Sequence, residues 1–320
     1  MITESVMINS KKTAKLNVLI ICGVHGDESY AVKLANNFKK NLDSKKFSEK
    51  IGTVTFVLAN QEGLKANSRV YSVSTENNNF DLNRAFGYKK IAEDYDSIVS
   101  KIKEEIVKNQ IVIDVHNSPN CEPSILIDYD GPNCDKIVWF LKESLVNTFM
   151  PIIRKSGVNS IKNYVNNCSG KVAFTVEIPG MGYQEVEGAF NYFNQAMINL
   201  INVCAVNFFI PNKEMPAGDI IGQENITKPL YSKHEGIINW IEKPFYNAGE
   251  KVCSIESFDS KKHECDIYAP EDCFLVCKSK SLYADAGSVI AELQPISSNL
   301  FKAWENLKKI EGKIYTNEEH

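Results

Sequence analysis

The chain of 320 residues is 43% hydrophobic and 24% charged, proportions that fit a soluble globular protein with one large domain and a smaller second one. Its net charge of −4 and its scattered lysines exclude the basic face of a nucleic-acid-binding protein, and no apolar run is long enough to span a membrane. Residues 1–15 are polar and lack the apolar segment of a secretory signal peptide.

Strand-like and helix-like segments alternate along residues 16–209. Apolar runs bounded by turn residues predict strands, and apolar residues at steps of three and four predict helices. The predicted strands are 16–23, 51–59, 111–115 and 172–178, and the predicted helices are 27–45, 89–109, 136–149 and 189–209. This alternation predicts an α/β fold in which a mostly parallel mixed sheet is flanked by helices. Ligands of such sheets bind at the carboxyl ends of the strands.

The composition changes near Pro211. Beyond it, short strand-like runs are interrupted by Gly, Pro and Asn in turns, as at 216–218 and 247–249, which is typical of a small β-barrel or sandwich. The segment 298–309 could form a closing helix. We therefore predict a first domain of residues 1–210 and a smaller β-rich C-terminal domain of residues 211–320.

The nine cysteines, an odd number without close pairs, favour free thiols in a reducing compartment, so we expect a cytoplasmic protein. Cys265, Cys273 and Cys277 lie near His263 in the sequence. Their spacing differs from the paired CxxC of zinc knuckles, and cysteine is common in strands as a small buried apolar residue. The role of these cysteines stays open.

The first chemically informative segment directly follows the strand predicted at 16–23. It reads Gly23-Val24-His25-Gly26-Asp27-Glu28 and leads into a predicted helix. A His and a Glu at the carboxyl end of a buried strand can face one point in space. They are two of the three protein ligands of a hydrolytic zinc site. A second His and a separate base are still needed, and the chain contains only five His.

Two later strands supply candidates for the missing parts. His116 follows the run 111–115, and Glu177 lies within the run 172–178. Two imidazoles and a carboxylate can hold one zinc ion and leave a position open, where water becomes a nucleophile near neutral pH. A separate carboxylate can take the proton from water and return it to a leaving amine, and a fixed cation can stabilise the developing oxyanion.

The arginines give an independent argument. Of 36 Lys and Arg residues only three are Arg, and two of them, Arg69 and Arg84, lie in one polar segment. A guanidinium offers a planar pair of donors to carboxylates and oxyanions that a Lys ammonium cannot reproduce. We interpret both arginines as site residues.

Each feature also has a purely structural explanation. His25 or His116 could be a hydrogen-bonded histidine at a strand end, and Glu177 could be an interior carboxylate satisfied by backbone donors. Asn83 with Arg84 could form a helix cap and a surface salt bridge. The occurrence of all of them beside predicted parallel strands favours a single site.

The chain resembles the succinylglutamate desuccinylase and aspartoacylase family, within the wider zinc carboxypeptidase-like superfamily. The matching motifs are GVHGDE at 23–28, DLNRAF at 81–86, IDVHNS at 113–118 and VEIPG at 176–180. They cover about the first 180 residues. The segment around 268–289 is similar to the small β-domain that ends many desuccinylase-like proteins.

The resemblance implies a role for each matching residue. His25, Glu28 and His116 bind one zinc ion per chain, and Glu177 is the general base and acid. Arg69 polarises the scissile carbonyl. The residues implied to bind substrate are Asn83 and Arg84, which hold a carboxylate, and Asn117, which is typical of aspartoacylase-type members.

The sequence departs from the family between 155 and 171. Members that act on acidic acyl groups use a further Arg shortly before the catalytic Glu, whereas this segment contains Lys162 and Lys171 and no Arg. The loop between Arg69 and Asp81 is also long and rich in Asn. A site without the second arginine would prefer substrates other than N-acetylaspartate or succinylglutamate.

The function implied is zinc-dependent hydrolysis of an N-acyl amino acid or related small amide. One alternative keeps the metal and cleaves a peptide or a cell-wall stem peptide as a carboxypeptidase. An alternative of another class is a catalytically silent binding protein on the same fold. We expect a small-molecule or short-peptide partner, no nucleic acid and no membrane, while the formation of a homo-oligomer is left open.

Overall fold

The structure is a computed structural model of the whole chain. It describes residues 1–11, 16–70, 81–87, 93–118, 124–128, 150–154, 159–179, 189–208, 227–241, 243, 245–257, 265–278 and 283–295.

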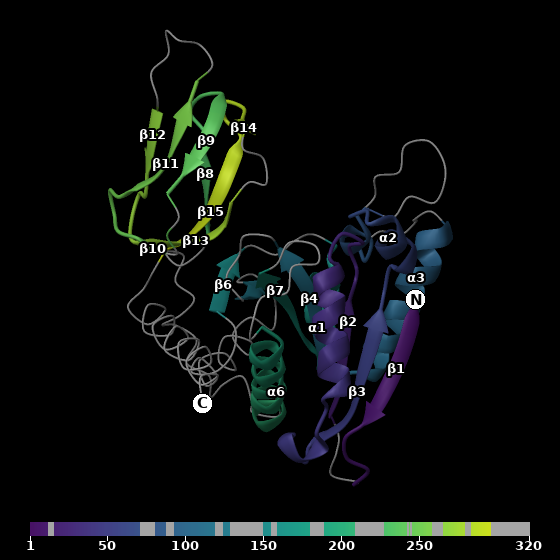
Figure 1. Cartoon of the computed structure of the whole chain (residues 1–320). Helices are drawn as coiled ribbons and strands as arrows, with labels where there is room; N and C mark the ends of the chain where they lie inside the picture. The colour runs from purple at the N-terminus through teal and green to yellow at the C-terminus, as the bar shows by residue number, and fades with distance from the viewer. Residues whose placement is uncertain are drawn as a thin grey trace, which may run out of the picture.

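A seven-stranded mixed sheet forms the centre of the N-terminal part (Figure 1). Its strands lie in the order β1-β3-β2-β4-β7-β5-β6. β1 is antiparallel to β3 and β5 is antiparallel to β7, whereas the other neighbours are parallel. The strands are β1 (Ile2–Met7), β2 (Leu16–Cys22), β3 (Ile51–Leu58), β4 (Ile111–Ser118), β5 (Ser124–Asp128), β6 (Met150–Arg154) and β7 (Val172–Pro179). The predicted α/β class with a mostly parallel mixed sheet is confirmed.

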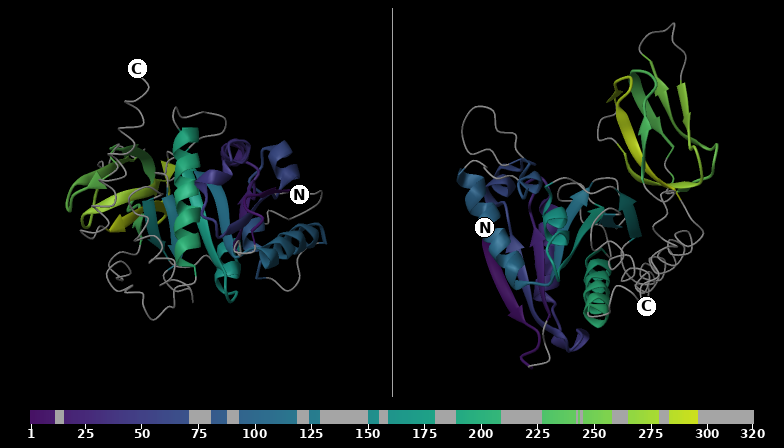
Figure 2. Two further views of the ribbon diagram at one scale, coloured as in Figure 1. Left: turned by 90° about the horizontal axis from the view of Figure 1, so that it is seen from below. Right: turned by 180° about the vertical axis from the view of Figure 1, so that it is seen from behind.

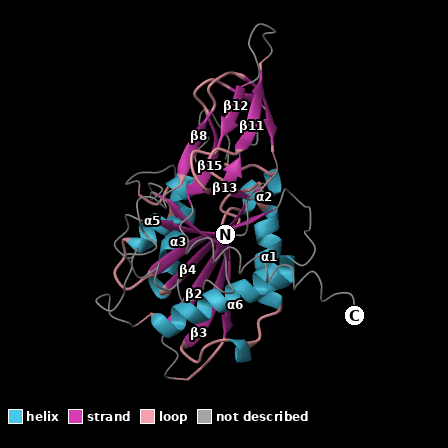
Figure 3. Ribbon diagram, turned by 90° about the vertical axis from the view of Figure 1, so that its left-hand side faces the viewer, coloured by secondary structure: helices cyan, strands magenta, loops and turns pink. Residues whose placement is uncertain are grey.

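Helices cover both faces of this sheet (Figure 3). α1 and α6 bury their apolar sides in a core with alternate residues of the central strands, such as Ile113 and Phe174. α3 and α5 form a second core with the intervening residues, such as Val112 and Ala173. The helices are α1 (Ser29–Lys40), α2 (Gln61–Ala66), α3 (Glu93–Lys108), α5 (Ile161–Asn166) and α6 (Ala189–Asn207), with 3-10 turns η1 (Ser44–Lys46) and η2 (Leu82–Arg84).

This layering explains the apolar strand sequences. A parallel strand buried on both faces needs side chains that avoid water on either side, so β2 (Leu16–Cys22) and the first part of β4 are almost continuously apolar. α6 is apolar over most of its length because it covers the centre of the sheet.

Residues 228–295 form two four-stranded antiparallel sheets, ordered β10-β13-β15-β8 and β12-β11-β9-β14. Buried residues from both sheets, for example Tyr246 and Leu293 from one and Ile238 and Val252 from the other, share a third core. Figures 1 and 2 show these strands as a body set apart from the seven-stranded sheet. The strands are β8 (Lys228–Tyr231), β9 (Gly236–Trp240), β10 (Phe245–Tyr246), β11 (Lys251–Glu256), β12 (Cys265–Tyr268), β13 (Cys273–Lys278), β14 (Tyr283–Ala284) and β15 (Val289–Pro295).

Several predicted boundaries are wrong. The strand that carries His116 does not end there, because β4 continues to Ser118 and stays paired with β7. The helix predicted at 27–45 is shorter, since α1 ends at Lys40. The Asp43 side chain then accepts the Lys45 amide and begins a separate 3-10 turn.

Other elements were not predicted or are not tested. β1 was read as polar sequence because it is an edge strand whose side chains are largely exposed. The predicted helices at 136–149 and 298–309 and the domain boundary at 210/211 lie outside the described residues, so they stay predictions. Within the described part of the chain, no helix is long and apolar enough to span a bilayer.

Candidate metal centre

One face of β4 changes from apolar to polar toward its carboxyl end. Val112 lies in the second core, while Asp114 and His116, two and four residues further on, share its side of the strand. The neighbouring strand β7 repeats the change, and the parallel register sets Glu177 directly beside His116. The sheet itself therefore brings a histidine and a carboxylate to one edge.

Two glycines allow the chain to turn after β2. Gly23 has a φ of +63°, a conformation that other residues rarely adopt. Gly26 lies against the start of α2, where an added Cβ would come within 2.1 Å of the Gly63 carbonyl carbon. The close approach excludes any side chain at position 26. The turn places His25 and Glu28 over the edge that carries His116.

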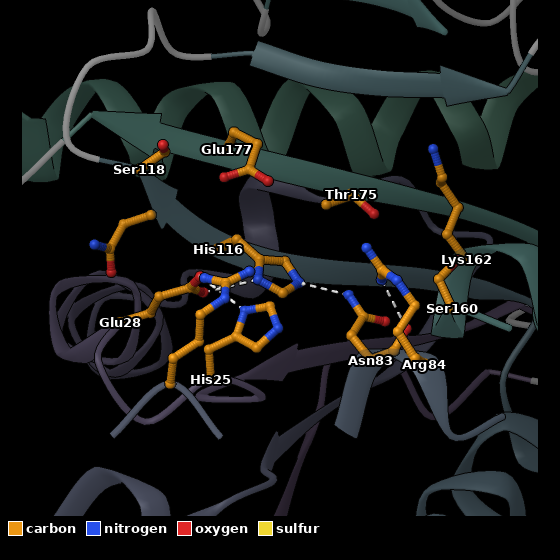
Figure 4. Close-up of a pocket in the computed structure, with 12 residues that line it drawn as sticks. His25, Glu28, Asn83, Arg84, His116, Ser118, Ser160, Lys162, Thr175 and Glu177 are labelled. Carbon is orange, nitrogen blue, oxygen red and sulfur yellow. Dashed lines mark hydrogen bonds and ion pairs between the residues drawn. The ribbon is translucent and has the colours of Figure 1, made fainter. Parts of the chain in front are cut away.

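Glu28 joins the two histidines. Its Oε1 lies 2.8 Å from His25 Nδ1, and its Oε2 lies 2.7 Å from His116 Nδ1. All three side chains are buried, and one ligand atom from each lies within 4.8 Å of the others, so the group could hold a metal ion. Figure 4 shows the three side chains converging. Among the described residues, no other His, Cys, Asp or Glu group meets this criterion.

A second carboxylate contacts each histidine on its other nitrogen. Asp81 Oδ1 lies 2.9 Å from His25 Nε2, and Asp114 Oδ2 lies 2.8 Å from His116 Nε2. A carboxylate can only accept, so each Nε2 atom donates its proton to Asp81 or Asp114, and a cation bound at the centre would take the place of the proton between each Nδ1 atom and Glu28. Metal-binding histidines are usually held in this way. The sequence analysis did not assign Asp81 or Asp114, although both stand two residues from assigned residues.

The three carboxylates determine the charge of the site. Burial lowers the pKa of His116, but Asp114 and Glu28 outweigh it and raise that pKa well above 6.5. The pKa of His25 is also raised, because its bonds to Asp81 and Glu28 exceed the effect of burial. Burial raises the pKa of Glu28 and Asp81, but the histidines reverse both shifts and bring the pKa of Asp81 to about 2. The site therefore favours positive charge at its centre.

Two imidazole nitrogens, one carboxylate and a surplus of negative charge fit a divalent cation such as zinc. The residues present thus satisfy the chemistry that such an ion requires, and Asp81 and Asp114 orient the two imidazoles toward it.

A pocket of about 420 Å³ opens over this group. It contains all eight residues that the sequence analysis assigned to the site, from His25 to Glu177. Four lining residues were not assigned. Lys162 stands out among them because its side chain is only 2% exposed. The full lining is His25, Glu28, Arg69, Asn83, Arg84, His116, Asn117, Ser118, Ser160, Lys162, Thr175 and Glu177.

The cations of the pocket have different environments. Arg69 is half-exposed, and its Nη1 lies 3.3 Å from Glu28 Oε1. Arg84 Nη1 donates to the Asn83 carbonyl oxygen at 2.9 Å. Lys162 comes from α5 and lies beside Ser160 at the far end of the pocket from Glu28 (Figure 4). The sequence signal for Lys162 was its place in the segment 155–171, where the family resemblance implies an Arg.

The two asparagines of the pocket each accept a backbone amide from the first turn of a helix. Asn83 Oδ1 accepts from Ile161 at 3.0 Å, and Asn117 Oδ1 accepts from Ala31 at 3.0 Å. The Asn83 amide nitrogen lies 3.5 Å from Asp114 Oδ2. The oxygens of both side chains are therefore engaged with helix backbone amides.

The described cysteines form no second metal group. Cys22, Cys168, Cys204, Cys253, Cys265 and Cys273 are free thiols. The side chains of His263 and Cys277 lie outside the described part of the chain, so the role of that cluster stays open.

Residues 14–203 match the family model described as the succinylglutamate desuccinylase/aspartoacylase catalytic domain. A search of curated protein sequences returned no match.

Three solved structures show a similar fold over 92% of this chain. A succinylglutamate desuccinylase/aspartoacylase from Rhodobacter sphaeroides has a TM-score of 0.68 at 15% identity, with 89% of that chain covered. The product-bound ectoine utilization protein EutE (DoeB) from Ruegeria pomeroyi has a TM-score of 0.68 at 13% identity, with 88% covered. An aspartoacylase family protein from Mesorhizobium loti has a TM-score of 0.67 at 18% identity, with 89% covered.

Proposed function

Since the chain belongs to the succinylglutamate desuccinylase/aspartoacylase family, we propose that it is an enzyme that hydrolyses the amide bond of a small N-acyl amino acid with one zinc ion per chain. The observation that carries the proposal is the convergence of His25, Glu28 and His116 in a pocket that also contains Glu177.

His25, Glu28 and His116 would hold the ion. When bound, zinc supplies a Lewis acid that polarises a carbonyl and makes water nucleophilic near neutral pH. Asp81 and Asp114 keep a proton on the Nε2 atoms of the histidines, so the Nδ1 lone pairs stay directed toward the centre.

Glu177 would move the proton. It lies beside His116 on the adjacent strand, and its carboxylate lines the pocket above the histidines (Figure 4). A carboxylate there can accept a proton from attacking water and deliver it to the nitrogen of the leaving amine. Because β7 holds Glu177 inside a hydrogen-bonded strand, this group is fixed relative to the ligands.

The positively charged side chains of the pocket would bind the negative charges of the substrate and of the reaction. Arg69 is next to Glu28 and can donate to the oxyanion that develops on the attacked carbonyl. Arg84 can hold the substrate carboxylate, with the amide groups of Asn83 and Asn117 as further donors in the same pocket. Lys162 adds a third cation, so an anionic substrate is favoured.

The size of the pocket supports a small substrate. About 420 Å³ falls within the range of small-molecule sites, roughly 300–1,000 Å³. A peptide substrate remains the alternative function with the same chemistry, and it would need a longer groove.

A comparison of two variants tests this function. Purified protein is expected to contain one zinc ion per chain and to hydrolyse at least one member of a panel of N-acyl amino acids faster than short peptides. His116→Ala should lose the metal. Glu177→Gln should keep the metal and lower kcat by about 100- to 10,000-fold, because it removes the proton carrier.

Three outcomes would contradict the proposal. They are wild-type protein without zinc affinity, His116→Ala with unchanged metal content, and Glu177→Gln with full turnover. Faster cleavage of peptides than of N-acyl amino acids would favour the carboxypeptidase alternative.

A further inference from the structure

The helix that follows the GVHGDE segment begins in an unusual way. α1 starts at Ser29, so its N-cap is Glu28. The N-cap side chain usually accepts a backbone amide from the second or third helical residue, and Ser, Thr, Asp and Asn are preferred there. Glu28 makes no such bond, because its two oxygens lie against His25 and His116. The residue that should cap the helix is engaged at the metal centre.

Another strand supplies the missing bond. Asn117 Oδ1 accepts the Ala31 amide at 3.0 Å, and Ala31 is the third residue of α1. This is the amide that an N-cap side chain commonly satisfies. Ala31 is 0% exposed and Asn117 is 7% exposed, so water does not readily replace the bond. Leaving a buried amide without a partner is costly.

The position of Asn117 in β4 gives this bond a second consequence. Successive residues of a strand point to opposite faces. His116 faces the metal group, while Asn117 faces the side on which α1 packs. His116 thus contributes one side chain of the candidate metal group, and the next residue, Asn117, holds the helix that begins after Glu28.

We propose that Asn117 is a positioning residue for Glu28. It caps α1 from β4 and so releases the Glu28 carboxylate from capping its own helix. The first turn of α1 is then held at a fixed distance from His116, which keeps both oxygens of Glu28 between the two imidazoles. The inference rests on the proposed function for the identity of the metal, and it gives the Asn117 oxygen a role that is independent of substrate.

The experiment measures zinc affinity in the absence of substrate. Metal-free full-length protein is titrated with zinc against a competing chelator, as wild type, Asn117→Ala and Asn117→Asp. The Ala variant removes the acceptor, and we expect its zinc Kd to rise about tenfold, the lower end of the effects seen for residues behind metal ligands. The Asp variant keeps an oxygen acceptor at a helix N-terminus, where negative charge is favoured, so its Kd should stay within about threefold of wild type.

Asn166→Ala is the matched control. Asn166 is equally buried and accepts the Ala173 amide at 2.8 Å, but it does not line the pocket. This variant should lower the melting temperature without changing the zinc Kd. Should Asn117→Ala fail to fold, Asn117→Gln takes its place, because it keeps the amide but displaces its oxygen by one methylene. It should weaken zinc binding in the same direction.

The possible results separate the two proposals. Equal zinc Kd values for wild type and Asn117→Ala would overturn the positioning role, and so would equal weakening in Asn117→Asp and Asn117→Ala. A role in substrate binding alone predicts no change of zinc Kd in any Asn117 variant. Wild-type protein that binds no zinc would contradict the proposed function, and this inference with it.

Discussion

At the scale of single residues, the carboxylates behind the histidines are as informative as the ligands. Asp114 is 1% exposed, and its Oδ2 accepts from His116, while its Oδ1 has no hydrogen-bond partner among the described residues. A buried carboxylate with one unused oxygen is costly unless positive charge lies close by. A cation at the His25, Glu28 and His116 group would supply that charge.

Replacing Asp114 by Asn should weaken metal binding. An amide can present its nitrogen to His116 Nε2, which would favour the wrong tautomer and turn the lone pair away from the centre. We expect a loss of metal affinity or activity of about 10- to 100-fold. Zinc titration of the metal-free variant measures it. Unchanged affinity with a wild-type melting temperature would refute the role of Asp114.

The thiol of Cys22 gives a prediction about pH. Burial and the nearby Asp114 raise the pKa of Cys22 to about 12 from an ordinary value of 9.0. A raised thiol pKa favours the neutral form, and the thiolate is the reactive species, so at pH 8 the reactive fraction falls roughly a thousandfold.

Alkylation at pH 8 followed by peptide mass spectrometry should leave Cys22 unmodified in the folded protein and label it after denaturation. Labelling should increase as the pH rises toward 12. Rapid labelling of native protein at pH 8 would show that β2 opens or that the thiol is not buried.

At the scale of elements, the aromatic contacts of α1 hold the helix that carries Glu28. Phe38, near its end, packs with ring centroids 6.2 Å from Phe56 of β3 and 6.2 Å from Phe193 of α6. It thereby joins helix, sheet and second helix in one core. The first turn of α1 is fixed by Asn117 and the last by Phe38, so the helix is held at both ends.

Phe38→Ala should lower the free energy of unfolding by about 3–5 kcal/mol, because it removes a fully buried ring and leaves a cavity. Denaturant titration measures the loss. Val107→Ala on the exposed side of α3 is the control and should stay within about 0.5 kcal/mol of wild type. A loss below 1 kcal/mol for Phe38→Ala would mean that the core around it is loosely packed.

At the scale of the whole molecule, the seven-stranded sheet that carries His25, Glu28 and His116 and the two antiparallel sheets have separate hydrophobic cores. The cores of the seven-stranded sheet contain residues up to Phe208, and the third core begins at Leu230. Separate cores need not unfold together, since two-state behaviour is a property of single domains.

Calorimetry of the metal-free protein should therefore show two transitions. Zinc at about one hundred times its Kd stabilises only the part that binds it, by about 2.7 kcal/mol, so one transition should move upward and the other should stay. His116→Ala should abolish the shift. If both transitions move equally, or if a single transition appears, the two parts unfold as one unit.

Much of the candidate metal centre could be predicted from the sequence, because the sequence patterns that indicate it lie within short segments. The apolar run of β2 and the turn that contains Gly23 and Gly26 identify the loop that bears His25 and Glu28 without any knowledge of the fold. The scarcity of arginine similarly directs attention to Arg69 and Arg84. Strand periodicity and residue type depend on near neighbours in the chain, so the sequence can point to these residues, and the structure places all four in one pocket.

Other parts could not be predicted because their partners are distant in sequence. Asp81 and Asp114 are ordinary acidic residues until the fold places them 2.9 and 2.8 Å from the two histidines. The extension of β4 beyond His116 depends on pairing with β7, more than fifty residues later. β1 was missed because the side chains of an edge strand are exposed, so they lack the apolar signal.

The sequence by itself determined the family, the α/β class and the residue types of a candidate metal site, since motifs and periodicity are written in short segments. Only the tertiary structure decided how these residues are used. Parallel register sets Glu177 beside His116, three carboxylates make the centre electronegative, and β4 caps α1 so that Glu28 can turn toward the histidines. The physical reason is that a hydrogen bond or a charge acts through space, and only folding converts distance along the chain into distance in space.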